Sequence, residues 1–220
     1  MKHLYFMPGM AAGPSIFEHI QLPENDFTCH YLEWIIPENK ERLTSYVSRL
    51  LQQVTHTNPV LIGVSFGGII VQEMAKQINV DQLILISTVK SNQEFPRRMR
   101  FSRLIGLHKV FPTRLVESFE VLSSYSRGVA PKKIERYKKY LSVNSSVYLE
   151  WALDTIVNWD QKEPLPGVIH IHGDADPVFP IKYIKNCIII PKGTHVMIVN
   201  RYRWFNEHLP ELIVHKGIKN

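Results

Sequence analysis

A serine flanked by glycines is the first feature of the sequence that could do chemistry. Residues 63–67 read Gly-Val-Ser-Phe-Gly, at the end of the apolar run 59–64 and before a helical pattern that extends to about residue 77. A serine on a tight strand-to-helix turn has a strained backbone, and side chains two residues to either side would collide. The free amides of the following helix can stabilise negative charge. The motif alone leaves two interpretations open, a nucleophile at Ser65 or an ordinary serine in a glycine-rich bend.

A serine nucleophile needs a base, and the chain has ten histidines. His195 differs from the others because it follows the last apolar run and a Lys-Gly-Thr loop, just before an apolar helical pattern. Ligand sites gather at the carboxyl ends of strands in open parallel sheets. Four histidines lie in or beside predicted strands, where a structural role is the simpler interpretation: His3, His30, His170 and His172. The remaining five, which include His56, accompany no pattern.

The acid that would orient such a base lies one predicted strand earlier. The run VIHIHGDADPVFP ends a strand pattern and places Asp174 and Asp176 in the turn that follows. Both could be plain turn residues, because Asp-Pro is a common turn pair. The resulting chain order of serine, aspartate and histidine instead favours a catalytic acid, since one fold family has this order and the two main serine-protease types do not.

Together these motifs resemble the α/β-hydrolase superfamily, and the resemblance spans the chain nearly end to end. GVSFGG is similar to the nucleophile elbow of that family, HGDADPVFP to its Gly-x-x-Asp acid loop, and GTHVMI to its terminal histidine loop. The resemblance implies that Ser65 is the nucleophile, Asp176 the acid and His195 the base. Asp174 is then a neighbour of the acid.

The resemblance also implies an oxyanion hole made of two backbone N–H groups. One would come from Phe66, directly after the nucleophile, and the other from Met10 in the loop MPGMAAG. Most relatives have His-Gly in this loop, whereas this chain has Pro8-Gly9. Because the donor is a backbone amide, the hole can survive the change.

The predicted fold is an α/β protein with a doubly wound parallel sheet of about six strands. Most of the predicted strands are continuously apolar, which is typical of strands covered on both faces, and helical patterns separate several of them. The strands are expected at residues 3–7, 27–34, 59–64, 82–87, 167–173 and 186–190. An N-terminal hairpin, common among relatives, is not expected here.

A helical lid is predicted as an insertion after the strand 82–87. Residues 1–90 and 160–220 would form the core and residues 91–159 the lid. Residues 91–140 contain 12 Lys or Arg and 4 Glu, whereas the rest of the chain has 14 basic and 16 acidic residues. A basic lid could attract an anionic substrate, but lysines that simply solvate a helix face are the commoner case. No nucleic-acid reading module accompanies the charge.

The composition fits one globular domain. Apolar residues make up 45% of the 220 residues and charged residues 21%, and no apolar run reaches the roughly 18 residues of a membrane span. Glycines and a proline interrupt the start before a signal-peptide core is complete, so we expect a cytoplasmic protein. Two widely spaced cysteines exclude a disulfide scaffold or a structural cysteine–zinc site.

The expected function is hydrolysis by a serine nucleophile. The substrate would be a small carboxylic ester, thioester or lactone, and no metal or organic cofactor is expected in the reaction. A carbon–carbon bond hydrolase or lyase with the same three residues is one alternative, because fold and triad do not fix the chemistry. A ligand-binding protein with little turnover is another. The sequence does not indicate the oligomeric state.

Overall fold

The computed structural model describes residues 1–97, 99, 139–143 and 145–217. Most of the predicted lid, including the helical pattern at residues 131–138, lies outside these described residues. The boundaries predicted for the lid therefore stay a prediction.

The centre of the molecule is a six-stranded, all-parallel sheet with strand order β2-β1-β3-β4-β5-β6. The predicted α/β fold and strand number are confirmed. The second strand ends three residues earlier than predicted, so that Trp34 lies in the loop beyond it. The strands are β1 (Lys2–Met7), β2 (Phe27–Tyr31), β3 (Val60–Val64), β4 (Gln82–Ile86), β5 (Ile169–Gly173) and β6 (Ile188–Ile190).

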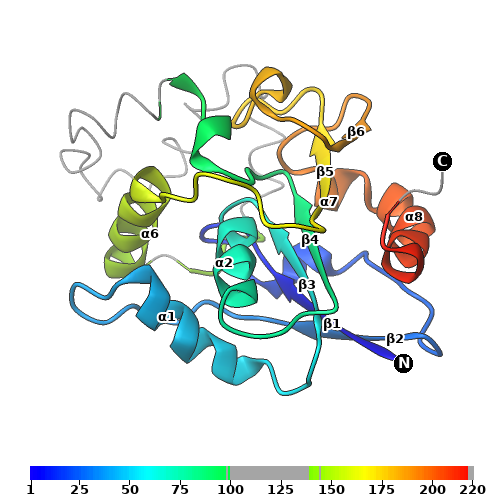
Figure 1. Ribbon diagram of the computed structural model, residues 1–220, viewed down its shortest axis with the longest axis horizontal. Coiled ribbons are helices and arrows are strands. Elements are labelled where there is room, and N and C mark those ends of the chain that lie inside the picture. Colours follow the sequence, from blue (N-terminus) through cyan, green and yellow to red (C-terminus); the bar gives the residue numbers. More distant parts are fainter. Residues whose placement is uncertain (98, 100–138, 144, 218–220) are drawn as a thin grey trace.

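Helices cover both faces of the sheet (Figure 1). On one face lie α1 (Leu43–Leu50), α2 (Phe66–Ala75) and α6 (Ser146–Asn158), and on the other lie α7 (Met197–Asn200) and α8 (Tyr202–His215). Short 3-10 helices are η1 (Pro14–Phe17), η2 (Leu51–Gln53), η3 (Asn92–Glu94) and η6 (Ile181–Tyr183). The helix predicted after the serine is α2, which is buried almost all round because it packs over the middle of the sheet.

The strand order creates a topological switch point at the carboxyl edge of the sheet. From β1 the chain goes outward to β2 and then returns past β1 to β3, so the loops after β1 and β3 leave neighbouring strands in opposite directions. Such a topological switch point is where open α/β sheets bind ligands. Met10 follows β1 and Ser65 follows β3, so both predicted residues lie at this switch point.

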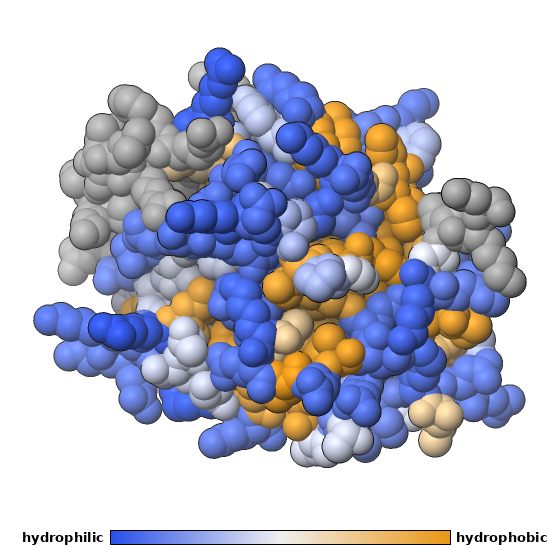
Figure 2. Space-filling model, viewed as in Figure 1, coloured by the Kyte–Doolittle hydropathy of each residue, from blue (hydrophilic) through white to orange (hydrophobic). Residues whose placement is uncertain are grey.

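Two apolar clusters form the core, one on each side of the sheet. Every residue of β3, β4 and β5 is buried, which explains why these strands are apolar without alternation. Hydrophilic side chains dominate the face shown in Figure 2, with smaller hydrophobic areas between them. None of the helices in the described ranges has the length and apolar character needed to cross a membrane.

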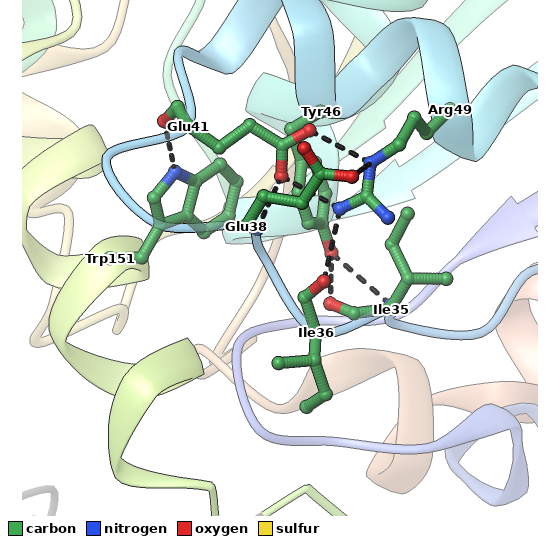
Figure 3. Close-up of polar contacts among 7 residues, drawn as sticks. All are labelled: Ile35, Ile36, Glu38, Glu41, Tyr46, Arg49 and Trp151. Atoms are coloured by element: carbon green, nitrogen blue, oxygen red, sulfur yellow. Dashed lines mark hydrogen bonds and ion pairs between the residues drawn. The ribbon is translucent and has the colours of Figure 1, made fainter.

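Helix α6 is hydrogen-bonded to the loop before α1 (Figure 3). The indole Nε1 of Trp151 donates to the carbonyl of Glu41 at 2.8 Å. The guanidinium of Arg49 binds the Glu41 carboxylate at 2.7–2.8 Å, and the Tyr46 hydroxyl donates to the carbonyl of Ile35 at 2.9 Å. A surface groove of about 910 Å³ runs between this loop and α6, and none of the predicted catalytic residues lines it.

Candidate active site

Ser65 lies on a sharp turn between β3 and α2, with a backbone conformation that L-residues rarely adopt. Its φ is 53° and its ψ is −121°. Hydrogen bonds hold both the amide and the carbonyl of Ser65 in place. The Ser65 amide donates to the Ile86 carbonyl at 2.9 Å. The Ser65 carbonyl accepts the Gly68 amide at 2.9 Å and the Thr88 hydroxyl at 2.7 Å. Strain of this kind persists only where the surroundings enforce it.

The spacing of the glycines around Ser65 follows from close backbone contacts. A Cβ atom on Gly63 would lie 2.4 Å from the Gly67 carbonyl oxygen, and one on Gly67 would lie 2.3 Å from the Pro8 carbonyl oxygen. The second contact places the turn directly against the loop after β1. The two glycines therefore allow the end of β3, the start of α2 and the loop after β1 to pack closely around Ser65.

The structure brings together Ser65, His195 and Asp176, from the loops after β3, β6 and β5. His195 Nε2 lies 2.9 Å from Ser65 Oγ, and His195 Nδ1 lies 2.9 Å from Asp176 Oδ2. An ionised carboxylate can only accept hydrogen bonds, so Nδ1 carries the proton of a neutral imidazole. Nε2 then offers a lone pair to the serine hydroxyl, which is the geometry that a general base requires.

Asp176 is buried, with 3% of its surface exposed, and it is held by several donors. Its Oδ1 accepts the amides of Val178 and Phe179 at 2.8 and 3.0 Å. Burial alone would raise the pKa of Asp176, but the charge and hydrogen bond of His195 and the Phe179 amide outweigh it and lower the pKa below its usual value. The carboxylate therefore stays ionised and able to stabilise an imidazolium.

A buried histidine that the sequence did not single out lies beside this acid. His172 Nε2 is 3.6 Å from Asp176 Oδ2 and 2.8 Å from the Phe179 carbonyl. Because a carbonyl accepts, Nε2 is the protonated nitrogen. Burial lowers the pKa of His172, against the opposing effect of Asp176, so the His172 ring is neutral. The negative charge of Asp176 is therefore not balanced by His172 and can stabilise a positive charge on His195.

The acid loop and the histidine loop are packed directly against each other. A Cβ on Gly173 would lie 2.1 Å from the Gly193 carbonyl oxygen, and that oxygen accepts the Ala175 amide at 3.0 Å. Asp174 Oδ1 accepts the Lys192 amide at 2.6 Å, which is a second hydrogen bond between the acid loop and the histidine loop.

Replacing Gly173 by alanine is expected to damage both stability and activity. The added methyl group must push the Gly193 loop away, and overpacking of this kind costs about 1–3 kcal/mol of unfolding free energy. Because His195 lies two residues after Gly193, any activity that depends on His195 should fall at the same time. Urea denaturation and steady-state kinetics measure the two effects.

Gly9→Ala is the matched control for stability, because its Cβ would lie at an ordinary 3.4 Å from Ser65 Cβ. It should keep or slightly raise the unfolding free energy, since alanine restricts the unfolded chain. Equal stability of Gly173→Ala and the wild type would contradict the contact.

The predicted oxyanion amides come from the two loops at the switch point, after β1 and after β3. Phe66 is the first residue of α2, where no preceding turn of the helix accepts its N–H. Within the described part of the chain, the Met10 amide donates no hydrogen bond. The carbonyl next to it, that of Gly9, accepts the Trp34 Nε1–H at 3.1 Å and the Ala12 amide at 3.1 Å. Trp34 also stacks on the Phe66 ring, with centroids 5.1 Å apart.

The same loop is held from the other side by α6 and the residues before it. The Tyr148 hydroxyl accepts the Ala11 amide at 3.4 Å, and the Ala11 carbonyl accepts the amides of Ser142 and Val143 at 3.0 and 3.2 Å. Trp34, Thr88 and Tyr148 thus support the site, although the sequence analysis did not select them. Only Trp34 carried a usable signal, since it closes a predicted strand at the carboxyl edge of the sheet.

Trp34→Phe is expected to lower kcat about tenfold with a smaller change in KM. Phenylalanine keeps the stacking on Phe66 but leaves the Gly9 carbonyl without its indole donor, so the Met10 amide is held less firmly. Complete loss of one oxyanion donor costs about 10²–10³ in kcat, and a loosened donor should cost less. Trp204→Phe on α8, for which no Nε1 hydrogen bond is found within the described residues, is the control. Wild-type kcat in Trp34→Phe would argue against a supporting role.

The fold and the Ser-His-Asp arrangement together define a doubly wound α/β protein with a site at the carboxyl edge of its sheet. A family model described as "Alpha/beta hydrolase family" matches residues 8–208. The chain therefore belongs to the alpha/beta hydrolase family. A comparison with curated protein sequences gives no match.

Solved structures with the same fold include two esterases and a bromoperoxidase. The esterase EaEST from Exiguobacterium antarcticum is 17% identical, with a TM-score of 0.71, over 97% of this chain and 92% of that one. A thermophilic esterase from Thermogutta terrifontis is 13% identical, with a TM-score of 0.67, over 99% and 91% of the two chains. A bromoperoxidase from Bacillus anthracis is 17% identical, with a TM-score of 0.68, over 97% and 92%. At these identities the likeness concerns the fold.

Proposed function

We propose that the protein is a serine hydrolase that cleaves a small carboxylic ester, thioester or lactone. The observation that carries the proposal is the unbroken hydrogen-bonded chain from Ser65 Oγ through His195 to the buried Asp176, with both links at 2.9 Å. The family membership and the two esterase structures support hydrolysis in general terms.

The first half of the reaction forms an acyl-enzyme. Ser65 Oγ attacks the carbonyl carbon while His195 Nε2 takes the hydroxyl proton, and Asp176 stabilises the imidazolium that results. The amides of Met10 and Phe66 hold the negative oxygen of the tetrahedral intermediate. When that intermediate collapses, His195 returns the proton to the leaving alcohol or thiol.

The second half releases the acyl group. A water molecule gives a proton to His195 and attacks the acyl carbon, after which the carboxylic acid leaves and Ser65 regains its proton. Acid–base chemistry by these side chains is sufficient for both halves. Attraction of an anionic substrate by a basic lid remains a hypothesis, because most of that segment lies outside the described residues.

The test is rapid-mixing kinetics with p-nitrophenyl acetate and p-nitrophenyl butyrate. An acyl-enzyme mechanism predicts turnover and, where deacylation is slower, a burst of p-nitrophenol close to one equivalent per chain. Intact-mass analysis of acid-quenched samples should show the acyl adduct on the peptide that contains Ser65. Turnover of a carbon–carbon substrate with no ester hydrolysis would favour the lyase or carbon–carbon hydrolase alternative.

A fluorophosphonate probe distinguishes the binding-protein alternative. A nucleophile activated by His195 should react within minutes at micromolar probe, whereas an inactive serine should not. Absence of both labelling and ester turnover in folded protein would contradict the proposed function.

A further inference from the structure

Three histidines that play no part in the proposed reaction meet on the α1 and α2 face of the sheet. His3 lies on β1, His30 on the edge strand β2, and His56 in the loop between η2 and β3. In the β1–β2 register Tyr5 pairs with His30, and His3 lies two residues before Tyr5 on the same strand. Paired residues of neighbouring strands lie on the same face of the sheet, and so do residues two apart on one strand. The side chains of His3, Tyr5 and His30 therefore lie on one face.

The ring nitrogens lie at distances that suit a shared metal ion. One nitrogen from each histidine lies within 4.8 Å of the other two. His3 Nδ1 is 3.1 Å from His30 Nε2, and the rings of His3 and His56 stack with centroids 3.5 Å apart. In a tetrahedral zinc site, with Zn–N bonds of about 2.0–2.1 Å, two ligand nitrogens are roughly 3.3 Å apart. The rings of His3 and His56 would have to rotate out of this stack to bring the three nitrogens onto one ion.

A buried tyrosine orients the histidine that comes from the loop. The Tyr5 hydroxyl lies 2.7 Å from His56 Nδ1, and it accepts the Thr55 amide at 3.0 Å. Tyr5 is 1% exposed, so its hydroxyl is a fixed point beneath the cluster. A hydrogen bond on one ring nitrogen is the usual outer support of a metal-binding histidine, because it fixes the tautomer and leaves the other nitrogen for the ion.

The cluster is open to solvent and offers ligands that suit transition metals. The rings are half-buried, so an ion has access from solvent. Imidazole is a preferred ligand of zinc, copper and nickel.

We propose that His3, His30 and His56 form a binding site for a divalent transition-metal ion such as Zn²⁺, with water completing the coordination. His3 is near the amino end of β1, whereas Ser65 follows the carboxyl end of β3, so the site lies at the opposite edge of the sheet from the proposed catalytic residues. The ion ties the edge strand β2 to β1 and to the loop before β3. The sequence analysis expected no metal in the reaction, and this site adds one that takes no part in it.

The experiment uses the full chain without a histidine tag. Equilibrium dialysis against Zn²⁺ with elemental analysis should give one ion per chain, and Co²⁺ should produce the visible absorption of a low-symmetry nitrogen site. His30→Gln and His56→Gln should abolish the cobalt spectrum and weaken zinc binding at least tenfold. Tyr5→Phe keeps the three ligands and should weaken binding about tenfold, as outer-support changes do. His208→Gln, on the surface of α8, is the control and should bind like the wild type.

Zn²⁺ should raise the melting temperature of the wild type and of His208→Gln, but not that of His30→Gln. Circular dichroism of each metal-free variant establishes that it is folded. No zinc bound to the wild type at 100 micromolar, or unchanged affinity in His30→Gln and His56→Gln, would overturn the proposal. So would loss of the ion in His195→Gln alone, because the ion would then belong to the proposed catalytic site.

Discussion

Ser65→Ala is expected to remove ester hydrolysis almost entirely, with a fall in kcat of about 10⁶-fold. Alanine lacks the oxygen that lies 2.9 Å from His195 Nε2, so no acyl-enzyme can form. The helix amides and the proposed oxyanion donors remain, and they should support only a small residual rate above water. Removing the hydroxyl leaves the backbone contacts of the turn in place, so the melting temperature should stay close to that of the wild type.

Ser15→Ala is the matched control, because Ser15 is an exposed serine on η1 that has no role in the proposed reaction. The two variants are compared by p-nitrophenyl butyrate turnover and by fluorophosphonate labelling followed by mass spectrometry. Only Ser65→Ala should lose both signals. If it retained the wild-type rate, a different nucleophile would have to be sought.

Asp176→Asn is expected to lower kcat about 10⁴-fold while leaving the fold intact. Oδ1 of Asp176 accepts two backbone amides, so an asparagine would keep its carbonyl oxygen there and turn its amide group toward His195 Nδ1. An NH₂ group can only donate, which would force Nδ1 to accept and place the ring proton on Nε2. The base would then face Ser65 with no lone pair.

Asp174→Asn separates the two aspartates of the acid loop. Asp174 is exposed and accepts only the Lys192 amide among the described hydrogen bonds, a contact that an asparagine carbonyl can replace. Its kcat should remain within about threefold of the wild type. A loss in Asp174→Asn comparable with that in Asp176→Asn would show that the acid had been assigned to the wrong residue.

The lowered pKa of Asp176 also predicts how the unfolding free energy of Asp176→Asn compares with that of the wild type as the pH falls. Because the folded-state pKa lies below that of the unfolded chain, the ionised carboxylate stabilises the native state above about pH 5. This contribution is lost as the pH falls through the folded-state pKa. The difference in unfolding free energy between wild type and Asp176→Asn should therefore narrow below about pH 4, as measured by urea denaturation.

The parts of the fold that the sequence predicted are those encoded by local pattern. Continuous apolar runs indicated the strands because both faces of a parallel sheet are covered. Gly63 and Gly67 indicated the elbow because each is needed for a contact with nearby backbone. The order of the three motifs predicted that Ser65, Asp176 and His195 lie at one edge of the sheet.

The parts that were missed depend on contacts between distant segments. The bond from Trp34 to the Gly9 carbonyl joins two loops, and the contact between Tyr148 and Ala11 joins α6 to the loop after β1. Neither pairing has a signature in the sequence on either side. His3, His30 and His56 were interpreted singly, and only the register of β1 against β2 shows that they share a face.

The contact between Gly173 and Gly193 has a practical meaning for the redesign of this protein. Because the acid loop and the histidine loop touch through their backbones, residues 169–195 form one cassette that contains both Asp176 and His195 of the proposed proton relay. The elbow at residues 60–75 is a second cassette, held by Thr88, which precedes the predicted lid. A redesign that keeps both cassettes whole leaves these backbone contacts in place.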